Sequence, residues 1–215
     1  MTRSDTWSAG WVSEKISHNK VSSAIVVGPN LIAIKLVGVD APLKVATISV
    51  DPVTITDLRE VLIDDSVEFV MNTKKDALIT GEAIEFAENK NFGLGTFGDL
   101  YAAINWQDLR NYISNDMQFV FLGLKQHTHV ESVKRLNNKV YQVTTRALPQ
   151  ATILVLNDYD LTAASVRNGL GKFGRCDIIL TSNPYCRTSP ESRDAAESCG
   201  VRVLSWKQLL GALSH

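Results

Sequence analysis

Several features that would narrow the class of protein are missing from this sequence. No apolar run approaches the ~18 residues that a membrane-spanning helix needs, and the first twenty residues contain no apolar stretch typical of a signal peptide. Neither sign of charge dominates, because 22 basic side chains stand against 23 acidic ones. With 45% hydrophobic residues, the composition excludes disordered, collagen-like and strongly polycationic chains. We expect a cytoplasmic globular protein outside the membrane.

Cysteine is also scarce. Cys176, Cys186 and Cys199 are odd in number and show no Cys-x-x-Cys spacing, which argues against a disulfide framework or a zinc site. We interpret them as small buried or half-buried thiols.

The two halves of the chain differ in net charge, although the chain as a whole is nearly neutral. Residues 1–115 carry 10 basic and 15 acidic side chains, whereas residues 116–215 carry 12 basic and 8 acidic ones. A mildly basic second half can face a phosphate backbone. Nucleic acid is therefore a candidate partner of that half, and association with a second copy of the chain stays open.

An internal similarity indicates how the chain is organised. Residues 68–104 align with residues 177–213 without a gap, at a constant offset of 109. Only five positions are identical, but both stretches show an apolar run, a polar loop, a helical segment with an Ala-Glu pair, a short alternating run and an apolar helix. The shared pattern predicts an internal duplication.

The similarity extends upstream. The runs VATISVD and ILVLND both resemble buried strands that end in an acid, and each is followed by a threonine, Thr54 or Thr162, suited to cap a helix. The preceding runs LIAIKLV and VYQVTTR are candidate hairpin partners. We predict an α/β fold class with two similar β-β-α-β-α-β-α lobes that form a pseudo-dimer. Their sheets should be largely parallel and Rossmann-like, covered on both faces, although one continuous sheet is an alternative.

This interpretation gives four segments. Residues 1–20 form an N-terminal segment, residues 21–105 the first lobe, residues 106–138 a mainly helical connector and residues 139–215 the second lobe.

The carboxyl ends of the predicted strands carry the candidate site, because ligands collect there in open α/β sheets. In the second lobe this edge holds Asp158 and Asp160 as candidate catalytic and metal-binding residues, with Thr162, Ser182 and Asn183 as ligand-binding residues. The spacing Asp-x-Asp-x-Thr resembles the nucleophile motif of haloacid-dehalogenase-type phosphatases. That resemblance implies Mg²⁺ as cofactor, with Asp158 as nucleophile and Asp160 as general acid. The alternative is that the motif is an acid at the end of a strand, followed by Thr162 as the cap of a helix.

Three weaker motifs have structural alternatives. His127-Thr-His129 has the spacing of a metal-binding pair if it lies on a strand, but the segment can equally be helical. The glycines of Gly93-Leu-Gly95-Thr-Phe-Gly98 match a dinucleotide fingerprint, yet they do not follow the first strand of a βαβ unit, so we expect a bulge or a tight strand–helix junction. Asn183-Pro-Tyr is similar to the strand-end motif of amino-methyltransferases, and its alternative is a turn.

Residues 176–213, CDIILTSNPYCRTSPESRDAAESCGVRVLSWKQLLGAL, resemble the closing β-α-β-α of restriction-endonuclease-like (Mrr-type) domains, and BRCT domains end similarly. The nuclease resemblance implies an aspartate on one hairpin strand and Glu-x-Lys on the next, holding Mg²⁺. The matching strands have no Glu-x-Lys, so the resemblance implies a lobe without nuclease chemistry.

Three functions follow from these observations. The leading one is a non-catalytic binding or scaffold protein with nuclease-like lobes that contacts nucleic acid. The others are a Mg²⁺-dependent phosphoryl-transfer or hydrolytic enzyme centred on Asp158 and Asp160, and a sensor of a nucleotide or another small ligand.

Overall fold

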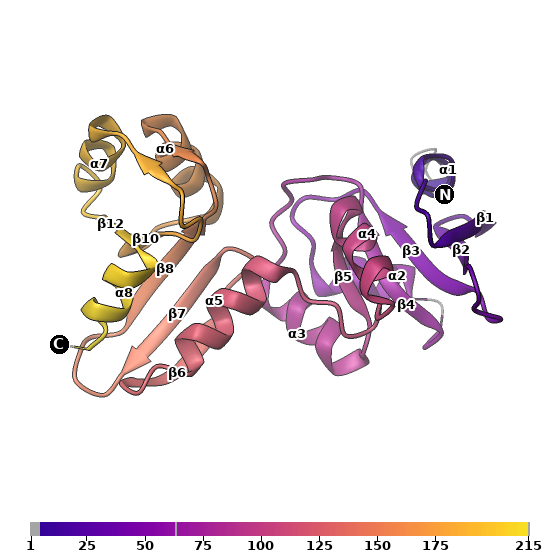
Figure 1. Ribbon diagram of the computed structural model, residues 1–215, viewed down its shortest axis with the longest axis horizontal. Helices are drawn as coiled ribbons and strands as arrows, with labels where there is room; N and C mark the ends of the chain where they lie inside the picture. The colour runs from indigo at the N-terminus through magenta and orange to yellow at the C-terminus, as the bar shows by residue number, and fades with distance from the viewer. Residues whose placement is uncertain (1–4, 63, 215) are drawn as a thin grey trace. The chain divides into compact units, whose positions relative to one another are not determined.

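The computed structural model describes residues 5–62 and 64–214. It divides the chain into two compact units, Met1–Ser114 and Asn115–His215, which are drawn from indigo to magenta and from pink to yellow in Figure 1. Each unit has its own five-stranded sheet. The alternative of one continuous sheet is therefore wrong.

The first unit contains a sheet of the order β1-β2-β3-β4-β5. Strands β1, β2 and β3 pair antiparallel, and β3, β4 and β5 pair parallel. Its elements are α1 (Asp5–Lys15), β1 (Val21–Gly28), β2 (Leu31–Leu36), β3 (Leu43–Ile48), α2 (Ile55–Val61), β4 (Val67–Asn72), α3 (Gly81–Lys90), β5 (Gly93–Thr96) and α4 (Phe97–Trp106).

Helices cover both faces of this sheet. Helices α1 and α4 share one apolar core with the strands, in which Val12 and Ile104 pack with Phe69 of β4. Helices α2 and α3 bury Leu58 and Ile84. The sequence explains this arrangement, because the interior strand β4 is apolar on both sides and needs cover on each of them.

The second unit repeats this order of elements. Its sheet has the order β12-β10-β8-β7-β6, with β6, β7 and β8 antiparallel and β8, β10 and β12 parallel. Its elements are α5 (Asn115–Lys125), β6 (Val130–Arg135), β7 (Val140–Thr145), β8 (Ala151–Leu156), β9 (Asp160–Leu161), α6 (Ala163–Phe173), β10 (Ile178–Thr181), β11 (Arg187–Thr188), α7 (Pro190–Glu197), β12 (Arg202–Ser205) and α8 (Trp206–Ala212).

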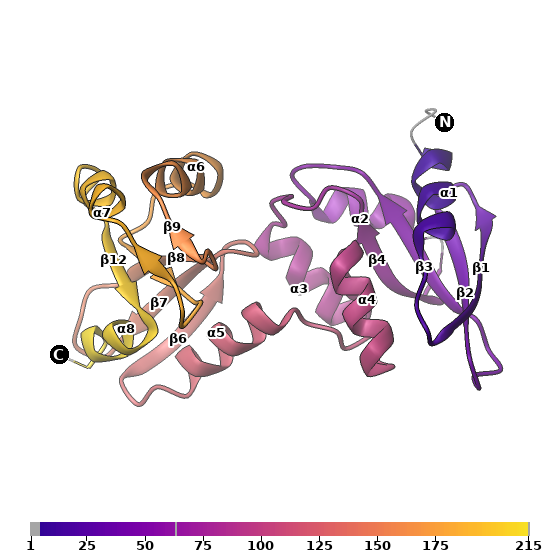
Figure 2. The same cartoon turned by 45° about the horizontal axis from the view of Figure 1, so that its top comes forward.

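The helices of the second unit again lie in two layers, which Figure 2 shows on either side of the sheet. Helices α5 and α8 form one core with Tyr141 and Ile153, whereas α6 and α7 form another with Leu154 and Ile179. In both units the first and last helices therefore cover one face, and the two middle helices cover the other.

Most of the predicted helices and strands are present, and two predictions need correction. The sheets are mixed rather than largely parallel, because each begins with three antiparallel strands. Residues 106–138 were expected as a connector, yet they include α5 and the edge strand β6 of the second sheet. Each unit thus has one helix and one strand before the predicted β-β-α-β-α-β-α series.

The predicted helix caps are present. Thr54 caps α2, where its side chain accepts the N–H of Asp57 and the Asp57 carboxylate accepts the N–H of Thr54. Thr162 caps α6 by accepting the N–H of Ser165 at 3.1 Å. These bonds satisfy N–H groups that have no partner inside a helix.

Across the described ranges of the chain, none of the helices has the length and apolar character required to cross a bilayer.

Candidate functional site

At the carboxyl ends of the second sheet, one of the two predicted acids lies beside a basic residue. After β8 and β10 the chain forms the short parallel pair β9–β11, which brings Asp160 opposite Arg187. The guanidinium donates to both carboxylate oxygens, with Nε 2.7 Å from Oδ1 and Nη2 3.1 Å from Oδ2. This two-point ion pair links the loops that follow β8 and β10. The sequence offered no signal for Arg187, because a two-residue strand has no recognisable pattern.

The other predicted residues of this edge take structural roles. Thr162 is the cap of α6. The amide oxygen of Asn183 accepts the N–H of Tyr185 at 2.9 Å, which forms the Asn-Pro turn. Burial raises the pKa of the Cys186 thiol, and the negative charges of Asp158 and Asp160 raise it further.

Ser182 is the exception at this edge. Its N–H donates to Leu156 O at 3.1 Å, whereas its hydroxyl oxygen is buried and makes no hydrogen bond with any residue of the described ranges. It is thus the predicted residue with spare hydrogen-bonding capacity.

The residues that the structure describes contain no group of three or more His, Cys, Asp or Glu side chains suited to a metal ion. For Mg²⁺, the chemistry of the edge is also unfavourable, because the Asp160 carboxylate already binds a guanidinium. A metal ion there would have to displace Arg187, and Mg²⁺ gives up its own water reluctantly. The geometry thus favours a structural role for Asp160.

The histidine pair lies in the turn between α5 and β6 rather than on a strand. His127 Nε2 lies 3.2 Å from the carbonyl oxygen of Leu210, so this nitrogen carries the proton, and Nδ1 accepts the N–H of His129 at 3.4 Å. Both ring nitrogens of His127 therefore have partners, and neither offers a free lone pair. His127 thus connects the turn to helix α8.

Two of the three glycines of the dinucleotide-like motif, Gly93 and Gly95, have structural roles. Gly93 and Gly95 lie on β5, and α4 begins directly after it at Phe97. A side chain at Gly95 would lie 2.6 Å from Asp99, whose carboxylate accepts the N–H of Thr96 to cap α4. The predicted tight strand–helix junction is confirmed.

The three cysteines are free thiols that differ in exposure. Cys176 is buried, and burial raises its pKa to about 11, whereas Cys199 is exposed. Because the thiolate is the reactive form, we expect iodoacetamide at pH 8 to modify Cys199 readily and Cys176 only after unfolding. Peptide mass spectrometry with and without denaturant measures this order. Equal labelling rates of the two thiols in the folded protein would contradict it.

A surface that the sequence did not predict lies on α5 and its neighbours. Lys125 Nζ and Arg135 Cζ lie over the ring of Phe121, 4.9 and 4.6 Å from its centroid. The rings of Phe119 and Trp206 contact each other with centroids 5.0 Å apart. We call Phe119, Phe121, Lys125, Arg135 and Trp206 the α5 face.

The α5 face is exposed where a ligand can reach it. The Phe119 side chain is 52% exposed and the neighbouring Leu122 44% exposed. Gly123 leaves room for Trp206 to pack closely on α5, because a side chain at this position would lie 2.4 Å from the indole ring. In the sequence, Phe119 and Leu122 are three residues apart, so a helix places them on the same side. The same spacing is typical of a helix face that packs into a core, so it did not indicate an exposed surface.

Comparison of the chain with protein-family models, with curated proteins and with solved structures gave no match.

Proposed function

We propose that the protein is a non-catalytic binding protein whose α5 face contacts single-stranded nucleic acid. The observation that carries this proposal is the exposed ring of Phe119, which packs on Trp206, near two cations that lie over the ring of Phe121 on the same helix. Bases stack on aromatic rings regardless of sequence, while lysine and arginine pair with the phosphates between them. An exposed aromatic ring near cations fits this chemistry.

The parts of the α5 face have distinct roles in this proposal. The Phe119 ring, half exposed and backed by Trp206, offers a face for stacking. Lys125 and Arg135 are held against Phe121, so their charges are positioned before a ligand arrives. The excess of 12 basic over 8 acidic side chains in residues 116–215 adds long-range attraction to a polyanion.

Two observations support a role without catalysis. The hairpin strands in which a nuclease of the resembled type carries its acids are β3 and β8, and neither contains aspartate or glutamate. The described part of the chain also has no metal-binding cluster. The repeated order of elements and strands in the two units supports our proposal that both derive by duplication from one nuclease-like unit.

Fluorescence anisotropy of a labelled oligothymidylate, with a duplex of the same length for comparison, tests the proposal. We expect the single strand to bind, with the logarithm of the association constant falling linearly with the logarithm of the salt concentration. Phe119→Ala should weaken binding by about 1–2 kcal/mol, or about 5- to 30-fold, because one stacked base is lost. Lys125→Gln should reduce the salt slope by about 1.

Matched controls lie in the same unit. Tyr185→Ala removes another exposed aromatic ring, and Arg167→Gln removes one charge from α6 on the opposite face of the sheet. Equal losses in Phe119→Ala and Tyr185→Ala, or no binding at low salt, would overturn the assignment of the α5 face. Cleavage of the oligonucleotide in Mg²⁺ or Mn²⁺ would overturn the non-catalytic part.

A further inference from the structure

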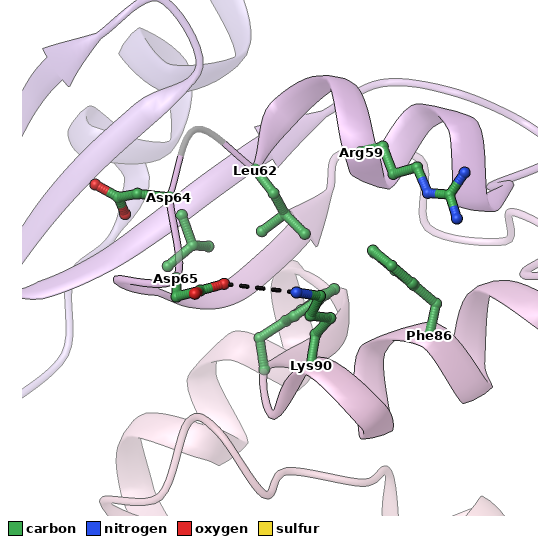
Figure 3. A pocket seen from close by; sticks show the side chains of 8 residues that line it. Arg59, Leu62, Asp64, Asp65, Phe86 and Lys90 are labelled. Carbon is green, nitrogen blue, oxygen red and sulfur yellow. Dashed lines mark ion pairs between the residues drawn. The ribbon is translucent and has the colours of Figure 1, made fainter.

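The first unit contains a cavity of about 350 Å³, a size within the range of small-molecule sites. Its walls come from α2, α3 and the amino ends of β4 and β5, and it is lined by Arg59, Leu62, Asp64, Asp65, Val67, Phe86, Lys90 and Phe92. Figure 3 shows Arg59 reaching from α2, and Phe86 and Lys90 from α3. The cavity belongs to the first unit, whereas the α5 face belongs to the second.

Part of the cavity is apolar and aromatic. Val67 and Phe92 are buried beneath it, being 3% and 4% exposed. The rings of Phe86 and Phe92 meet edge to face, with centroids 6.1 Å apart, and Leu62 adds aliphatic surface. Such a wall favours a flat apolar group that makes the same ring contacts.

Both acids of the cavity already have partners. Asp64 accepts hydrogen bonds from the N–H and hydroxyl of Ser66, which lower its pKa, and it lies 3.8 Å from Lys44. Asp65 pairs with Lys90, also at 3.8 Å, as the dashed line in Figure 3 shows. Each of the two carboxylates is thus matched by one lysine.

Arg59 is the charge without a counter-charge. Its guanidinium carbon lies 5.5 Å from the centroid of the Phe86 ring, and it makes no hydrogen bond or ion pair with any residue in the described ranges. A guanidinium presents parallel N–H donors that match the two oxygens of a carboxylate. The cavity thus combines a free cation with an aromatic wall.

We propose that this cavity binds a small aromatic carboxylate. The ring of the ligand contacts Leu62, Phe86 and Phe92, and its carboxylate accepts hydrogen bonds from Arg59. One free positive charge selects one negative charge, which favours a carboxylate over a phosphate dianion. The volume of the cavity is at the small end of small-molecule sites, which suits a ligand as small as a benzoate.

Titration of the ¹⁵N-labelled full chain with benzoate, followed by amide chemical shifts, tests this site. We expect shifts centred on the amides of Leu62, Asp65 and Lys90, with saturation below about 10 mM. Acetate lacks the ring and benzylamine has the opposite charge, so both should bind at least about tenfold more weakly. Tighter binding of phenyl phosphate than of benzoate would overturn the carboxylate assignment.

Two variants separate specific binding from general charge attraction. Arg59→Met keeps an apolar stem on Phe86 but loses the guanidinium, and it should weaken benzoate at least about tenfold. Lys35→Met removes an exposed charge from β2 of the same unit and should leave the affinity unchanged. Equal affinity in the two variants, shifts centred away from the cavity, or no saturable binding would overturn the proposal.

Discussion

Gly93→Ala is expected to destabilise the first unit by about 3 kcal/mol, the upper end for overpacking a closely packed site. A side chain at this position would lie 2.2 Å from the carbonyl oxygen of Leu109 and 2.5 Å from the ring of Phe69. Phe69 is fully buried, and Leu109 contributes a backbone atom, so neither can move without displacing the core. Urea unfolding followed by circular dichroism measures the loss.

The same motif supplies the control. Gly98 lies in the first turn of α4, and a side chain there would meet nothing closer than 3.8 Å. Because alanine favours a helix over glycine by about 1 kcal/mol, Gly98→Ala should be neutral or stabilising. If Gly93→Ala is as stable as Gly98→Ala, the close contact with Leu109 is not a constraint on the fold.

Leu154→Ala is expected to destabilise the second unit by about 3 kcal/mol, within the range for buried leucine. Leu154 is fully buried on the central strand β8, where it packs in the core shared with α6 and α7. Removing its side chain leaves a cavity between the sheet and these helices. Hydrogen exchange measured by mass spectrometry should show faster exchange in β8 and β10.

The hydrogen-exchange measurement also tests the division of the chain. Each unit has its own sheet and its own buried core, so peptides of the first unit should keep their protection in Leu154→Ala. Leu122→Ala, at an exposed position of α5, is the control and should change stability by no more than about 0.5 kcal/mol. Equal loss of protection in both units of Leu154→Ala would contradict independent cores.

The central and parallel strands could be predicted because both of their faces are buried. The apolar runs of β4 and β10 stand out against polar loops, and Thr54 and Thr162 mark the helix starts after β3 and β8. Strand β6 was missed because an edge strand is half solvated. Its sequence VESVKR carries three charges, and a charged segment next to a helix resembles a connector.

The candidate site was predicted less well than the fold. The chain positions of Asp158 and Asp160 were evident, but the partner of Asp160 depends on how two loops meet, which spacing does not encode. The cavity near Arg59 was missed for a related reason. Its lining combines two helices with the amino ends of strands, whereas the general rule for open sheets directs attention to the carboxyl ends.

The strand order described above also bears on how the chain folds during synthesis. In the first sheet every strand pairs with the strand that precedes or follows it in the chain, so each pairing spans at most one intervening helix. Such local pairing favours fast folding, and β5 ends at Thr96. The first sheet can therefore form while the ribosome is still synthesising the second half. Strand β4 is then already paired when β10 is made, so the two apolar strands do not pair with each other.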